Sequence, residues 1–83
     1  MEVVLLTQVH CAFCGDAKQL LDRLASEYGL EVREVDLSSP EGTELARAHG
    51  ILFPPGILVD GEAVSSGRPS ERRLRRELER DDR

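Results

Sequence analysis

Two cysteines, Cys11 and Cys14, have the most distinctive chemistry in this sequence. They stand three positions apart in the stretch HCAFCGDAK, residues 10–18, and the chain has no other cysteine. A pair with this spacing can form half of a metal site, make a stabilising disulfide, remain as inert thiols, or exchange electrons as dithiol and disulfide. A structural zinc ion needs four ligands, and the remaining candidates, His10 and His49, show no second paired spacing. The redox interpretation is therefore favoured.

The composition describes a small acidic protein. The chain has 83 residues, of which 40% are hydrophobic and 33% charged, and its formal net charge is −5. This length predicts one domain over residues 1–83, with a thin core. An acidic protein is not expected to bind nucleic acid, and no apolar run approaches the length needed to cross a membrane. The arginine-rich end, residues 68–83, has no interleaved aromatic residue, so nucleic acid is not expected there either.

The start of the chain bears on its location. Residues 1–6 lack the basic leader and the small-residue cleavage site of a signal peptide. We therefore expect a cytoplasmic protein, in a reducing compartment where close cysteine pairs are more often catalytic or metal-binding than structural. We also expect it to act as a monomer.

The elements that must position the cysteines alternate between strand and helix. Strands are predicted at residues 3–6, 31–36, 57–59 and 63–65, the last two joined by an Asp60–Gly61 hairpin turn. Helices are predicted from near Ala12 to Gly29, from a Ser39 cap to Gly50, and from near Ser70 onward. The order β-α-β-α-β-β-α predicts an α/β fold with a four-stranded mixed sheet flanked by helices.

This arrangement assigns different roles to the two cysteines. Cys11 would lie where the first strand meets the first helix, facing the unpaired amides and the positive end of the helix dipole. Those groups favour a thiolate, so we expect its pKa to lie below the free value of roughly 8.5. Cys14 would lie one turn along, on the buried apolar face. We therefore predict that Cys11 attacks a disulfide and that Cys14 resolves the mixed disulfide.

Three stretches carry a resemblance to a known family. CAFCGDAKQLL, residues 11–21, resembles the glutaredoxin pattern C-x-x-C-x-x-A-K-x-L-L, and Asp36 matches the acidic residue that ends the second strand there. PGILVDG, residues 55–61, resembles the cis-proline, strand and hairpin segment. From residue 3 to about residue 78 the chain resembles a glutaredoxin-like protein of the thioredoxin superfamily. The resemblance implies a thioredoxin-like fold and a thiol-disulfide oxidoreductase that reduces protein or glutathione mixed disulfides.

The resemblance also implies substrate-binding positions, some of which depart from the family pattern. Pro55 would be the cis-proline beside the cysteines, and Pro54 the residue whose backbone meets the substrate, although proline has no N–H to donate. The glutathione-binding Gly-Gly-x-x-Asp stretch is replaced by SSGRPS, residues 65–70. Arg68, or Ser70 with the amides of the last helix, could still receive a carboxylate. These departures weaken the glutathione site without altering the thiol chemistry.

The neighbours of the cysteines have alternative interpretations. His10, as an imidazolium, would lower the pKa of Cys11 and pass a proton to the leaving thiol, or it is simply an exposed loop residue. Phe13 is predicted to offer an apolar contact to a partner. Lys18 matches a lysine near the site of the family, or it is a solvated surface charge.

The expected partners follow from the resemblance. They are a disulfide-bearing protein or small thiol as substrate, and glutathione or a flavin disulfide reductase as electron donor, with no tightly bound cofactor. Two other functions stay open. Some glutaredoxins hold a [2Fe–2S] cluster between two subunits, although the retained Cys14 and the altered glutathione site argue against it. A thioredoxin fold can also serve as a binding module without turnover.

Overall fold

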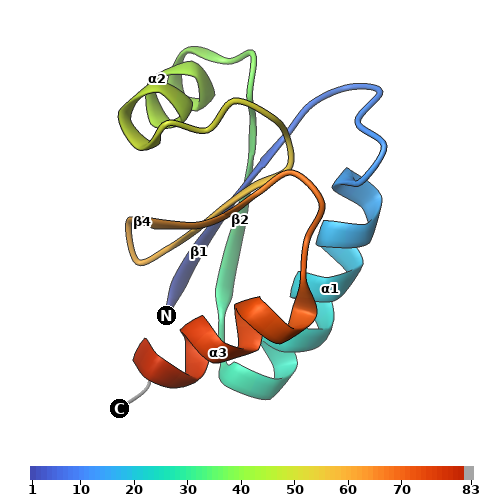
Figure 1. Cartoon of the computed structure of the whole chain (residues 1–83), viewed down its shortest axis with the longest axis vertical. Coiled ribbons are helices and arrows are strands. Elements are labelled where there is room, and N and C mark those ends of the chain that lie inside the picture. Colours follow the sequence, from blue (N-terminus) through green and yellow to red (C-terminus); the bar gives the residue numbers. More distant parts are fainter. Residues whose placement is uncertain (82–83) are drawn as a thin grey trace.

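Four strands form a mixed sheet in the order β2-β1-β3-β4 (Figure 1). The computed structural model describes residues 1–81. β1 pairs in parallel with β2, while β3 pairs antiparallel with both β1 and β4. The elements in chain order are β1 (Glu2–Thr7), α1 (Cys14–Tyr28), β2 (Glu31–Asp36), α2 (Pro40–His49), β3 (Gly56–Val59), β4 (Glu62–Ser66) and α3 (Glu71–Asp81). The predicted thioredoxin-like order and sheet are confirmed.

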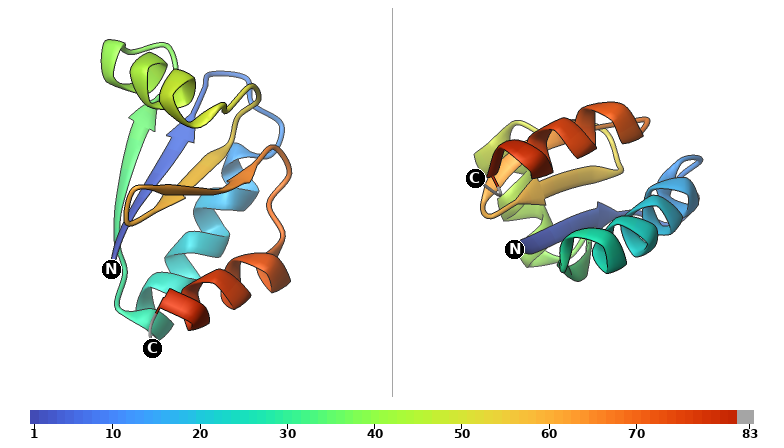
Figure 2. Two further views of the ribbon diagram at one scale, coloured as in Figure 1. Left: turned by 60° about the vertical axis from the view of Figure 1, so that its left-hand side comes forward. Right: turned by 90° about the horizontal axis from the view of Figure 1, so that it is seen from below.

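The central strand β1 separates two apolar clusters. Val3 and Leu5 point to one face, where they pack with α1 and α3. Leu6 points to the other face, where it packs with residues of β2 and β3 and with Leu45 of α2. Figure 2 shows α2 set apart from α1 and α3, across the sheet. This alternation along one strand produces three layers, with two helices on one side and one on the other.

The helix boundaries follow local signals. The Ser39 hydroxyl accepts a hydrogen bond of 3.0 Å from the Gly42 amide and caps α2, as predicted. α1 ends at Gly29, whose φ of 67° is the left-handed conformation that glycine adopts without strain. However, α1 begins at Cys14 and not near Ala12, because residues 12 and 13 form a turn. Cys11 therefore lies in the loop before the helix, and Cys14 is the first residue of α1.

The last helix, α3, packs its leucines inward and its arginines outward. Leu74 and Leu78 are buried in the cluster that also contains α1 residues. Arg75 and Glu71, one turn apart on this helix, form an ion pair with 2.9 Å between Arg75 Nε and Glu71 Oε2. Within residues 1–81, none of the helices is both long enough and apolar enough to cross a membrane.

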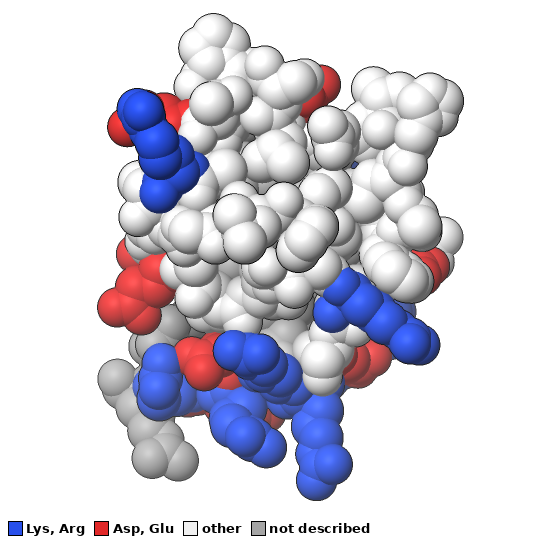
Figure 3. All heavy atoms as spheres, turned by 45° about the horizontal axis from the view of Figure 1, so that its top comes forward, with Lys and Arg blue, Asp and Glu red and all other residues white. Residues whose placement is uncertain are grey.

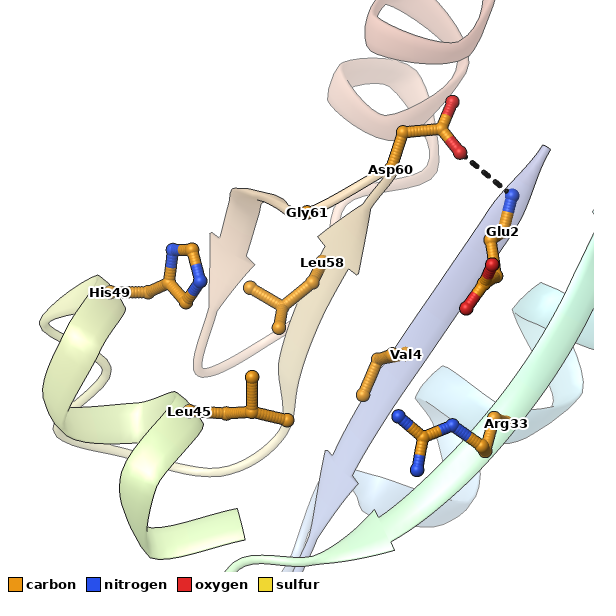
Figure 4. A pocket seen from close by; sticks show the side chains of 8 residues that line it. All are labelled: Glu2, Val4, Arg33, Leu45, His49, Leu58, Asp60 and Gly61. Carbon is orange, nitrogen blue, oxygen red and sulfur yellow. Dashed lines mark hydrogen bonds between the residues drawn. The ribbon is translucent and has the colours of Figure 1, made fainter. Parts of the chain in front are cut away.

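The single helix α2 leaves part of its face of the sheet uncovered. A hollow of about 350 Å³ lies there, with an apolar floor that includes Val4, Leu45 and Leu58 (Figure 4). Arg33 and His49 line it as well, the latter from the last turn of α2. Neither cysteine lines this hollow. The site that the sequence predicts therefore lies elsewhere.

Candidate active site

Cys11 and Cys14 are joined by a disulfide at the N-terminal end of α1. Their Cα atoms are 5.4 Å apart, an ordinary separation for a disulfide. Both residues are partly exposed, so Cys14 does not lie on the buried apolar face of the helix as predicted. The reason is that Cys14 is the first residue of α1, and the buried face of the helix begins one turn later, at Ala17.

The first turn of α1 carries free hydrogen-bond donors beside this pair. Phe13 is the N-cap residue, and its ring accepts no hydrogen bond from the helix amides. Ala17 N bonds to Phe13 O at 3.0 Å, which leaves the earlier amides of the turn without a helical partner. These amides and the positive end of the helix dipole stabilise negative charge. They are the groups that would stabilise a thiolate when the disulfide is reduced.

A proline segment precedes β3. The Pro54–Pro55 peptide bond is cis, as the resemblance implied. Pro55 is buried, and its carbonyl accepts a hydrogen bond of 2.9 Å from the Gly67 amide. Pro54 is partly exposed and contributes a carbonyl but no N–H. A substrate backbone at this position would therefore find an acceptor but no donor.

The loop between β4 and α3 connects the proline segment to the cysteines. Gly67, which is tied to Pro55, adopts a φ of 83°, and Arg68 follows it directly. The Arg68 guanidinium carbon lies 5.8 Å from the centre of the Phe13 ring, which is the geometry of a cation–π contact. The structure thus brings together three predicted site residues, Phe13, Pro55 and Arg68, from three separate loops.

Exposed apolar side chains lie in two of these loops. Val9 and Phe13 belong to the loop before α1, and Leu52 and Phe53 to the loop before β3. Their exposed fractions run from 39% for Phe13 to 78% for Leu52. Figure 3, in which the top of Figure 1 comes forward, shows a broad uncharged surface with charged side chains of both signs at its borders. Phe13 therefore lies at the surface, where it was predicted to meet a partner.

Two further predicted site residues are Ser70, directly before α3, and His10, in the loop before Cys11. Ser70 caps α3, since its hydroxyl accepts a hydrogen bond of 3.3 Å from the Arg73 amide. The cap uses an acceptor position of the hydroxyl, so its O–H stays available to donate to a carboxylate. His10 is exposed and adopts a left-handed φ of 64° in the turn before Cys11. The described residues contain no group of three or more His, Cys, Asp or Glu side chains able to hold a metal ion.

A second hollow, of about 310 Å³, is lined by Cys14 and was not predicted. Lys18 and Glu34 line it too, with 3.6 Å between the ammonium nitrogen and a carboxylate oxygen. Thr7 donates a hydrogen bond of 3.3 Å to the same carboxylate. The feature that could have revealed these residues is the parallel pairing of β1 with β2. That pairing places Glu34 and Asp36 at the end of the sheet nearest Cys14. Sequence reasoning treated Lys18 only as a surface charge or as a counterpart of the family's lysine.

The comparison with known proteins now bears on this geometry. A family model described as a thioredoxin domain matches residues 1–79. The chain belongs to the thioredoxin-domain family. The match confirms the superfamily that the sequence pattern indicated, and two of the similar proteins are named thioredoxin or probable thioredoxin, not glutaredoxin.

Three relatives of this thioredoxin-domain protein illustrate its similarity. A curated protein from Archaeoglobus fulgidus, described as a probable thioredoxin, is 27% identical over 71 residues, or 86% of this chain and 78% of that protein. A solved structure of a malarial protein has a TM-score of 0.68 at 22% identity, covering 96% of this chain and 93% of its own. Thioredoxin 1 from Thermosipho africanus has a TM-score of 0.66 at 13% identity over the full length of both chains. At these identities the two solved structures support the fold alone.

Proposed function

We propose that this thioredoxin-domain protein reduces disulfides by thiol-disulfide exchange, with Cys11 as nucleophile and Cys14 as resolving cysteine. The observation that carries the proposal is the Cys11–Cys14 disulfide at the uncapped N-terminus of α1. Both cysteines are partly exposed, so the assignment rests on position: Cys11 lies in the loop before the helix and Cys14 within its first turn. The description of the archaeal relative as a probable thioredoxin supports the same chemistry.

The reaction proceeds in two exchanges. The Cys11 thiolate attacks one sulfur of the substrate disulfide, so that a new S–S bond forms and the other substrate sulfur leaves as a thiolate that takes up a proton. Cys14 then loses its proton and attacks Cys11 Sγ, which releases the second substrate thiol and closes the Cys11–Cys14 disulfide. Two electrons pass from the protein to the substrate, and an external dithiol, two molecules of glutathione or a flavin disulfide reductase must return them.

Protein and peptide disulfides are the substrates we favour over glutathione mixed disulfides. The stretch at residues 65–70 lacks the acidic residue that, by the family resemblance, helps to hold the γ-glutamyl end of glutathione. The exposed side chains Val9, Leu52 and Phe53 offer apolar area that a polypeptide can cover. We further propose that the protein works in a reducing cytoplasm, which would keep the pair available as a dithiol.

Trapping the mixed disulfide tests this proposal. A reduced Cys14→Ser variant is mixed with two peptide segments that are joined by a disulfide, one of them fluorescent. One of the two segments is expected to remain bound to Cys11 as a mixed disulfide, which mass spectrometry detects. The matched Cys11→Ser variant should form its adduct at least about tenfold more slowly, because the proposal makes Cys11 the thiol that the free amides of the first turn activate. The opposite order of rates would reverse the assignment of the two cysteines. If neither variant reacts faster than free cysteine, the protein is not an oxidoreductase of this kind.

A further inference from the structure

Arg68 contacts Phe13, one of the two residues that separate Cys11 from Cys14. It comes from the loop between β4 and α3, and its guanidinium lies over the ring of Phe13, the residue between the cysteines that precedes Cys14. The Gly67 amide bonds to the Pro55 carbonyl and so fixes the start of this loop against the proline segment. The loop that carries Arg68 is thereby tied to the proline segment through Gly67 and to Phe13, the residue before Cys14, through the guanidinium.

The charge of Arg68 is not neutralised by the described part of the protein. Among the side chains of residues 1–80, no carboxylate lies within 4.0 Å of its guanidinium, and Asp16, three residues after Phe13, does not reach it. Most of the other basic side chains on α1, α2, β2 and α3 do have such a partner, namely Lys18, Arg23, Arg33, Arg47, Arg75 and Arg80. Among the described side chains, Arg68 is therefore a cation without a carboxylate partner.

The stacking on Phe13 determines how this cation can be used. A guanidinium lying over an aromatic ring is restrained in orientation, while its N–H groups around the edge stay free to donate. A carboxylate is the group that matches such an edge, because it accepts two parallel hydrogen bonds from one guanidinium. A positively charged group at the same place on a substrate would be repelled by Arg68.

We infer that Arg68, restrained by Phe13, selects substrates in which an acidic side chain stands close to the reacting cysteine of a polypeptide disulfide. This inference rests on the proposed function and adds to it the class of substrate. Arg68 acts here as a specificity-determining residue, and the bonds made and broken are those of the two exchanges described above. Because Arg68 and Phe13 are both exposed, we expect the preference for acidic substrates to change the rate of association more than the rate of thiol-disulfide exchange.

Matched peptides test the inference. Three disulfide-linked fluorescent peptides would differ only in the residues flanking the cysteine, which are aspartate, asparagine or lysine. The wild-type protein is expected to show a kcat/KM ratio of about three to ten for the aspartate over the lysine peptide at low salt. The ratio should approach one as the salt concentration rises to about 1 M, where charges are screened within about 3 Å.

Variants of Arg68 and a distant arginine separate selection from a general charge effect. Arg68→Glu is expected to invert the ratio, so that the lysine peptide becomes the better substrate, and Phe13→Leu to reduce it by removing the ring while keeping the cation. The control Arg76→Glu, an exposed position on α3, makes the same change in net charge and should leave the ratio as in the wild type. Thermal unfolding of each variant shows whether it is folded.

Three outcomes separate the role of Arg68 in substrate selection from the proposed oxidoreductase activity. A wild type that reduces the asparagine peptide but shows equal rates with the aspartate and lysine peptides would overturn the role of Arg68 and leave the oxidoreductase in place. An equal change of ratio in Arg68→Glu and Arg76→Glu would overturn it too, because the effect would then come from net charge. A wild type that reduces none of the three peptides would overturn both.

Discussion

Gly42, in the first turn of α2, lies directly against the backbone carbonyl of Asp36 at the end of β2. A Cβ atom at Gly42 would overlap that carbonyl oxygen and come within 2.9 Å of the Leu37 Cα. The close approach results from the cap of α2, because the Ser39 hydroxyl donates a hydrogen bond of 2.6 Å to the Asp36 carbonyl and accepts one from Gly42 N. This contact fixes the end of β2, where Asp36 lines the hollow that includes Cys14.

Replacing Gly42 with alanine is expected to lower the free energy of unfolding by about 1–3 kcal/mol, because backbone must move to admit the methyl group. Urea denaturation measures this change. The matched control is Gly15→Ala in the first turn of α1, where no atom beyond the neighbouring residues and the local helix backbone lies within 4 Å of the added Cβ. Alanine should leave stability there unchanged or raise it by up to about 0.5 kcal/mol. Equal stability of the two variants would mean that the α2–β2 contact is not as close as described.

Asp36 also links stability to pH. Its carboxylate accepts hydrogen bonds from the Ser38 hydroxyl at 2.6 Å and the Ser38 amide at 2.8 Å, and the bond from the hydroxyl is the main cause that lowers its pKa below the ordinary 3.8. A lowered pKa in the folded state gives stability that is present above about pH 4 and is lost as the pH falls through the folded value.

An Asp36→Asn variant is therefore expected to lose less stability than the wild type between about pH 5 and about pH 2. Thermal unfolding midpoints across that range provide the measurement. Asp22→Asn serves as the control, since Asp22 is exposed on α1 and makes no side-chain hydrogen bond or ion pair with the described residues. Identical acid profiles for Asp36→Asn and the wild type would show that the Ser38 bonds do not favour the ionised carboxylate.

The fold could be predicted because its boundaries depend on local chemistry. Ser39 and Pro40 begin α2, Gly29 ends α1 in a left-handed conformation, and Asp60–Gly61 forms the turn between β3 and β4. Each of these signals acts within a few residues, so a single sequence is enough to find it. The start of α1 was placed two residues early because Phe13 gives no capping signal.

The parts of the site that the sequence did not predict depend on pairing between distant segments. The ion pair of Lys18 with Glu34 requires the register in which Glu34 lies opposite Leu5 on β1. The contact of Arg68 with Phe13 requires the loop after β4 to return to the start of α1. Neither follows from periodicity, because period-two alternation assigns a face to a strand residue but not a neighbour.

Tyr28 joins the ends of α1 and α3 and offers a direct spectroscopic test of the helix packing. Its hydroxyl donates a hydrogen bond of 2.8 Å to Glu79, and that bond is the main cause that raises the pKa of Tyr28 above the ordinary 10.0. The raised pKa means that the bond stabilises the fold below about pH 10 and is lost as the pH rises through the folded value. Tyr28 is the only tyrosine and the chain has no tryptophan, so tyrosinate absorbance reports on this residue alone.

The absorbance titration of the wild type is expected to have its midpoint above 10, and Glu79→Ala to bring it back toward 10. Glu77→Ala is the control on the same helix, because Glu77 bonds to Arg80 and not to Tyr28. A midpoint that is equally high in Glu79→Ala would place the origin of the shift elsewhere, and would question the docking of the end of α3 on α1.

The ion pair beside Cys14 leads to a prediction about the second exchange. Lys18 and Glu34 line the same hollow as Cys14, and their charges act in opposite directions on the thiolate that must attack Cys11. Lys18→Met removes a cation that favours this thiolate and should slow the release of the second product. Glu34→Gln removes an anion that disfavours it and should speed the release. Because both side chains are about half exposed or more, solvent screening limits each effect to about twofold to threefold.

Single-turnover release of the fluorescent peptide, followed after attack by Cys11, measures this step by itself. Opposite changes in the two variants are the decisive feature, since loss of the ion pair by either substitution would disturb the local structure in the same direction. Lys18→Arg retains the cation and should release the peptide at close to the wild-type rate. Equal slowing in Lys18→Met and Glu34→Gln would mean that the pair supports the position of α1 on β2 and does not act on the charge of Cys14. Reduced differences at high salt would accompany the electrostatic outcome, because the pair is accessible to solvent.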